Sequence, residues 1–96
     1  MSRGAMRWHV KPDENQPDII TALESIGCEV LDLSRVGQGC ADLLVWRKAT
    51  CTLRLIEVKT AKGKLNPKQS KFHDKFSGCT FIARSPMEAI RIMQDG

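Results

Sequence analysis

The sequence of 96 residues predicts an α/β domain in which helices flank one mixed sheet, in the order α-β-β-β-α-β-α. Two apolar runs, 43–46 and 53–56, are separated by a short polar stretch, which is typical of paired central strands. Three other segments place apolar residues at helical spacing behind a proline or a capping residue. Because the second helix falls between the third and fourth strands, it is expected to form the crossover between them.

The individual elements follow from local signals along the chain. A helix is expected at 17–26, between a proline that fits the first turn and a terminal glycine. Its apolar stripe consists of Ile19, Ile20, Leu23 and Ile26. Residues 28–33 favour a strand, and the loop at 34–41 contains two glycines that suit either close approach to a phosphate or a flexible connector. A short strand at 79–83 and a last helix after a capping box at 85–88 complete the domain.

The second helix is expected to begin after Asn66, its N-cap, and to run to about Phe76, with a proline in its first position. Gln69 has two interpretations: it closes a capping box with Asn66, and it stands at the helix end nearest the central strands. Phe72 and Phe76 share its face of the helix and are expected to pack inward.

The chain has the size of one domain with a thin core. We expect an irregular N-terminal arm at 1–14, which is polar and basic without periodicity, and a single domain at 15–96. The start of the chain has no apolar stretch as long as a signal peptide, and no run approaches a membrane span. These features predict a soluble, cytoplasmic protein.

Charged residues stand at the ends of the two central strands. Asp42 heads the first apolar run, and Glu57 and Lys59 close the second. Since side chains alternate along a strand, Glu57 and Lys59 point the same way, and antiparallel pairing brings Asp42 beside them. Two carboxylates at such a short distance from each other are suitable ligands for Mg²⁺, and a nearby lysine can orient or deprotonate a water molecule. The alternative is a strand end that emerges into solvent with an ordinary Glu/Lys pair.

The positive charge is concentrated directly after these residues. Residues 59–75 contain six lysines and one acid, so this segment carries +5 while the rest of the chain sums to −1. Such a concentration suits a polyanionic substrate that passes over the site. The alternative is a solvated, lysine-rich loop and helix face.

The four cysteines lie at long intervals without a paired Cys-x-x-Cys, so zinc is not expected. Cys28, Cys51 and Cys79 stand at or just before expected strands and are predicted to be buried, reduced thiols. Cys40 is two residues from Asp42, which leaves a reactive or inhibitory thiol as an alternative.

Four ordered blocks resemble the PD-(D/E)xK nucleases and, more narrowly, the small stand-alone virus-type replication-repair nuclease (VRR-Nuc) domains common in phages and prophages. The blocks are the helix that begins near Asn15, the segment 39–44 with Asp42, the triplet Glu57-Val58-Lys59, and the segment 65–69 followed by Phe72. This resemblance covers nearly the whole chain and implies a restriction-endonuclease-like fold.

The resemblance implies a catalytic set of four residues and a divalent ion. Asp42 and Glu57 would bind Mg²⁺ or Mn²⁺, with the backbone carbonyl of Val58 as an additional ligand. Lys59 would position or activate the hydrolytic water, and Gln69 would assist from the helix. The products would carry 5′-phosphates.

Two positions depart from the family pattern. Ala41 replaces the proline before the aspartate, which affects backbone rigidity more than chemistry. Many relatives place a glutamate ligand on the first helix where this chain has Asn15, whose amide oxygen is a further candidate metal ligand with less charge.

The resemblance further implies a DNA endonuclease that acts on branched replication or recombination intermediates, similar to Holliday-junction resolvases. Because one site cuts one strand, symmetric cleavage of a four-way junction would require a homodimer. Three alternatives stay open: a flap or nick nuclease, a DNA-binding accessory protein without activity, and a small basic domain whose acid pair is structural. The lysines expected to contact DNA are Lys62, Lys64, Lys68, Lys71 and Lys75.

Overall fold

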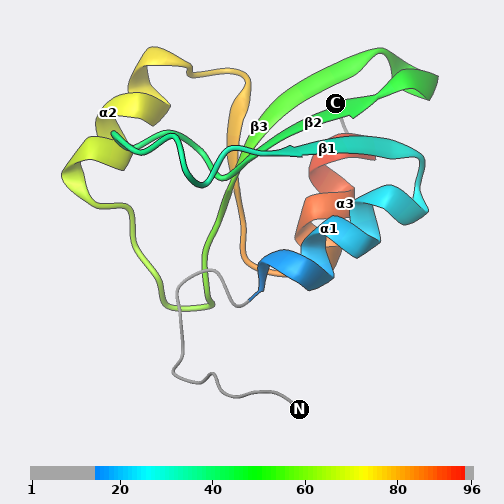
Figure 1. Cartoon of the computed structure of the whole chain (residues 1–96), viewed down its shortest axis with the longest axis horizontal. Coiled ribbons are helices and arrows are strands. Elements are labelled where there is room, and N and C mark those ends of the chain that lie inside the picture. Colours follow the sequence, from blue (N-terminus) through cyan, green and yellow to red (C-terminus); the bar gives the residue numbers. More distant parts are fainter. Residues whose placement is uncertain (1–14, 95–96) are drawn as a thin grey trace.

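The computed structural model describes residues 15–94, so the arm expected at 1–14 lies outside the described residues. The element order matches the predicted α-β-β-β-α-β-α pattern (Figure 1). The helices are α1 (Gln16–Ser25), α2 (Pro67–Lys75) and α3 (Pro86–Gln94), and the strands are β1 (Cys28–Asp32), β2 (Leu43–Arg47), β3 (Thr52–Val58) and β4 (Thr80–Ala83). Within residues 15–94, no helix is both long and apolar enough to span a bilayer.

The four strands form one mixed sheet in the order β1-β2-β3-β4. β1 pairs antiparallel with β2, and β2 pairs antiparallel with β3. A short 3₁₀ turn, Lys48–Thr50, joins β2 to β3, and Cys51 closes it in the left-handed conformation with φ of 54°. β4 pairs parallel with β3, so the connection between them crosses over through α2, as predicted.

Helices α1 and α3 lie side by side over one face of the sheet (Figure 1). They contribute Ile19 and Leu23 from α1 and Ala89 and Met93 from α3, all fully buried. The facing strand residues, which follow the two-residue period, are Cys28, Leu43, Val45, Ile56, Val58 and Ala83. This single layer of packing forms the hydrophobic core.

The opposite face of the sheet carries a second row of apolar side chains, which we call the open sheet face. The strand register aligns Leu31 with Leu44, Leu44 with Leu55, and Trp46 with Leu53, so these five residues share one side. Leu31 and Leu53 are 57 % and 54 % exposed, so neither α1 nor α3 covers them.

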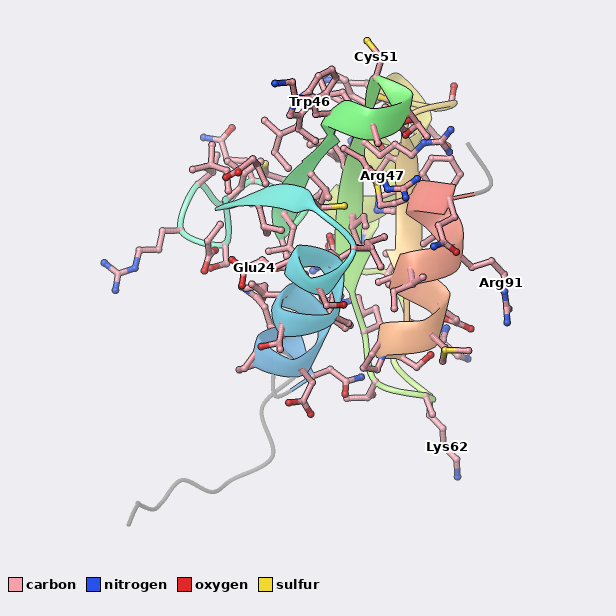
Figure 2. The ribbon with its side chains drawn as sticks, turned by 90° about the vertical axis from the view of Figure 1, so that its right-hand side faces the viewer. Glu24, Trp46, Arg47, Cys51, Lys62 and Arg91 are labelled. Carbon is pink, nitrogen blue, oxygen red and sulfur yellow. The ribbon has the colours of Figure 1, made fainter. Side chains whose placement is uncertain are left out.

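Two expectations about individual side chains are wrong. Phe76 is 45 % exposed because it caps the end of α2, where its ring contacts that of Phe72 at a centroid distance of 4.6 Å. Cys51 is exposed because the tight turn before β3 directs it into solvent (Figure 2), whereas Cys28 is buried and Cys79 is half-buried. All four cysteines are free thiols.

Candidate active site

The start of β2 lies beside the end of β3, and this brings the two predicted acids together. Leu43 pairs with Ile56, so Asp42 stands opposite the Glu57 end of β3. The Asp42 carboxylate accepts a hydrogen bond from the backbone N–H of Val58, with 2.8 Å between N and Oδ2. This contact holds Asp42 in place against the backbone of the neighbouring strand.

Glu57 is the most unusual of these residues, because this acidic residue is only 2 % exposed. Its Oε2 accepts a hydrogen bond from Gln69 Nε2 at 3.2 Å, while its buried Oε1 has no partner among the described residues. Burial, together with the negative charge of Asp42, raises the pKa of Glu57 to about 8, and Lys59 opposes this only in part. A cation bound between the two carboxyl groups would favour the ionised form of both.

Lys59 and Glu57 are linked through Gln69. Lys59 is buried, and its Nζ donates a hydrogen bond to Gln69 Oε1 at 2.9 Å. The same Oε1 accepts from the backbone N–H of Asn66 at 2.9 Å, and the Gln69 N–H donates to Asn66 Oδ1 at 2.9 Å. Both interpretations of Gln69 therefore hold geometrically, because one side chain closes the capping box of α2 and contacts the lysine and the acid.

The loop between β1 and β2 packs directly on the first turn of α2 at Gly39. This glycine has φ of +79°, and a Cβ at its position would overlap the backbone carbonyl of Lys68 and stand 2.9 Å from the Gln69 nitrogen. Gly37 has the same φ, but a Cβ there would meet nothing within 4 Å. Of the two glycines in this loop, only Gly39 is needed for the close approach that places Gln69.

Asn15 lies behind the Lys59 backbone. Its Nδ2 donates to the carbonyl oxygen of Lys59 at 3.2 Å and to that of Arg84 at 2.9 Å. Arg84 in turn donates from Nη1 to the carbonyl oxygens of Thr60 and Gly63, at 2.8 and 2.6 Å. The role of Arg84 was not predicted, because nothing local in the sequence indicates a contact with a segment more than twenty residues away.

The structure gathers three of the five predicted DNA-contacting lysines. Lys68, Lys71 and Lys75 line a groove on α2, next to the loop that leads to Asp42. Lys62 and Lys64 are exposed in the connection between β3 and α2, and Figure 2 shows Lys62 projecting away from the body of the domain.

The donor set at this site suits a hard divalent cation. Within residues 15–94, no group of three or more His, Cys, Asp or Glu residues is placed to hold a metal ion. Two adjacent carboxylates, one with a buried and unpartnered oxygen, match the way Mg²⁺ is usually held, with water and substrate oxygens completing the octahedron.

Comparison with known proteins agrees with the fold. The family model for the VRR-NUC domain matches residues 9–89. A solved structure titled "VRR_NUC domain" superposes with a TM-score of 0.69 at 25 % sequence identity, covering 86 % of this chain and 94 % of that chain. No match was found among curated proteins.

The family match identifies this mixed-sheet domain as a nuclease of the PD-(D/E)xK type. The chain belongs to the VRR-NUC family. Nucleases of this type act on DNA and generally use a divalent metal ion.

Proposed function

We propose that the domain is a Mg²⁺- or Mn²⁺-dependent endonuclease that hydrolyses phosphodiesters in branched DNA, with Asp42, Glu57 and Lys59 as its catalytic residues and Gln69 assisting them from α2. The observation that carries this proposal is Glu57: it is buried beside Asp42, has one unpartnered oxygen, and is linked through Gln69 to Lys59. A buried charge in such a place is costly unless it is paired or bound to a cation.

Asp42 and Glu57 would hold the metal ion, and the Val58 carbonyl and the Asn15 amide oxygen are proposed as further ligands. A divalent ion in this place supplies a water of lowered pKa and stabilises negative charge on the phosphoryl oxygens. The N–H of Val58 already fixes one oxygen of Asp42, which leaves the other oxygen for a ligand.

Lys59 is suited to orient the attacking water. An ammonium group has three N–H donors, and one of them is directed to Gln69 Oε1. The remaining donors can hold a water molecule or a phosphate oxygen close to the carboxylates. Gln69 thereby acts as a positioning residue for both Lys59 and Glu57.

Cleavage of labelled four-way junction, flap and linear duplex, with Mg²⁺, Mn²⁺ or chelator, tests this assignment. Asp42→Ala and Lys59→Ala should each abolish cleavage. Glu24→Ala and Lys48→Ala, at exposed positions away from the site, serve as matched controls and should leave the rate unchanged (Figure 2 shows Glu24 on α1). Cleavage that survives either site substitution would contradict the assignment of Asp42 and Lys59 to the active site. Junction binding by the wild type without any cleavage would favour a DNA-binding accessory role.

We propose further that the active form on a four-way junction is a homodimer, which would bring two sites to one junction. The open sheet face supports this proposal. It offers a contiguous row of apolar side chains, centred on Leu44 and Trp46 and flanked by the exposed Leu31 and Leu53, which can pair with a second copy about a two-fold axis.

Sedimentation of the wild type and of Leu53→Lys tests the dimer. The charge placed on the open sheet face should shift the protein to monomer and abolish paired cuts on the junction. Met87→Lys, a substitution at another exposed apolar residue, on α3, should change neither. A wild type that sediments as a monomer, or a Leu53→Lys variant that stays dimeric, would contradict this interface.

A further inference from the structure

A groove of about 410 Å³ lies between the loop at 36–40 and helix α2. We call it the lysine groove. Its volume is within the range of about 300–1,000 Å³ typical of sites that enclose small ligands. The candidate catalytic chemistry described above does not use this groove.

Part of the lining of the lysine groove is apolar and aromatic. Phe72 and Phe76 place their rings 4.6 Å apart with 35° between the planes, and Val36 lines the groove from the loop. Val36 is 61 % exposed and Phe76 45 % exposed, and none of the three belongs to the core cluster. Packing of the core therefore does not account for these apolar side chains.

Another part of the lining is cationic. Lys68, Lys71 and Lys75 line the groove from α2, and none of the acidic residues within 15–94 lines it. Aromatic rings next to a row of lysines are the arrangement by which proteins bind single-stranded nucleic acid, with bases on the rings and phosphates on the cations. A duplex presents phosphates to such lysines, but its bases are already stacked on one another.

Two residues that line the groove are close in sequence to residues of the candidate active site. Cys40 is two residues from Asp42, and Lys68 directly precedes Gln69, whose side chain contacts Glu57. A nucleotide in the groove would therefore be adjacent to the phosphodiester at the active site.

We propose that the lysine groove binds one unpaired nucleotide of the DNA substrate, with its base against Phe72 and Phe76 and its phosphates against the lysines. This inference rests on the proposed function and predicts that, among branched DNAs, those with a single-stranded nucleotide next to the cut bind most tightly. Flaps and gapped junctions carry such a nucleotide, and continuous duplex does not.

Binding measured in chelator, so that no cleavage occurs, tests the groove directly. The probes are a flap and a matched duplex, each with 2-aminopurine at the nucleotide beside the branch. Wild type should bind the flap more tightly and change its 2-aminopurine fluorescence. Phe76→Ala should weaken flap binding by about 5- to 150-fold, the cost of losing one stacked base, and leave duplex binding unchanged.

Two further variants separate the groove from general effects. Met87→Ala, which removes an exposed apolar side chain from α3, should match wild type on both probes. Val36→Ser, on the opposite wall, should also weaken flap binding. Because Val36 does not belong to α2, this loss would show that the effect of Phe76→Ala comes from the groove and not from damage to the helix. Equal losses on flap and duplex, or no preference of wild type for the flap, would overturn the proposal.

The outcomes for the groove and for the nuclease assignment are distinguishable. If Asp42→Ala abolishes cleavage while Phe76→Ala binds flap like wild type, the nuclease assignment stands and the groove proposal fails. If wild type cuts no DNA in either metal while Phe76→Ala still loses flap binding selectively, the groove proposal stands and the catalytic assignment fails.

Discussion

Replacement of Glu57 with glutamine should stabilise the metal-free protein at neutral pH. The carboxyl group is buried beside Asp42, and burial raises its pKa from an ordinary value of 4.5 to about 8. Between these two values the folded protein retains a proton on Glu57 that the unfolded chain has lost. Since the folded state then binds more protons, the free energy of unfolding falls as pH rises.

The magnitude follows from the size of this shift. One pKa unit corresponds to about 1.4 kcal/mol, so stability should fall with a slope approaching 1.4 kcal/mol per pH unit between pH 5 and 8. Across pH 5 to 7, the wild type should lose about 2 kcal/mol relative to Glu57→Gln. Above pH 8 the ionised form prevails in both states, and the difference should become constant.

Urea denaturation in the presence of chelator, at whole pH units from 5 to 8, measures this difference. Glu24→Gln, which changes an exposed glutamate on α1, is the control and should follow the wild type at every pH. Addition of Mg²⁺ or Mn²⁺ should raise wild-type stability more at pH 8 than at pH 5, because the ion binds the ionised carboxylate, and should raise that of Glu57→Gln much less. A gap between wild type and Glu57→Gln that is independent of pH would refute the reasoning.

Two other predictions concern the placement of α2. Gly39→Ala should reduce cleavage at least tenfold, because the added Cβ displaces the backbone that carries Gln69. Gly37 has the same φ but open space around it, so Gly37→Ala should keep activity and lower the free energy of unfolding by only about 1–2 kcal/mol. Gln69→Ala and Asn66→Ala should each lower the free energy of unfolding by about 1 kcal/mol, because each damages the capping box. Only Gln69→Ala should also lose cleavage, since it alone removes the link between Lys59 and Glu57. Single-turnover rates and urea denaturation of each pair measure both effects, and equal rates within a pair would contradict the assignment.

The sequence was sufficient to predict the element order, because each element carries its own local signal. Asn66 and Pro67 mark the start of α2, and the structure places the expected capping box there. The meeting of Asp42 with Glu57 also follows from local information, since a short turn between two strands determines the antiparallel register.

The supporting contacts of the site could not be predicted in the same way. Asn15 donates to the carbonyl oxygens of Lys59 and Arg84, residues that lie 44 and 69 positions away. A backbone carbonyl is present at every residue, so such a contact leaves no pattern in the sequence. The exposure of Phe76 was not predicted either. Helical periodicity shows on which face of α2 this side chain lies, but not how far the rest of the domain covers that face.

The contacts that form the site also attach α2 to the domain. No residue of α2 is fully buried, so this helix is not held by the core as α1 and α3 are. It is held instead by Gly39 against Lys68 and by the hydrogen bonds of Gln69 with Lys59 and Glu57. The hydrogen bonds of the candidate site therefore also fix the position of α2, and with it the lysine groove that α2 lines.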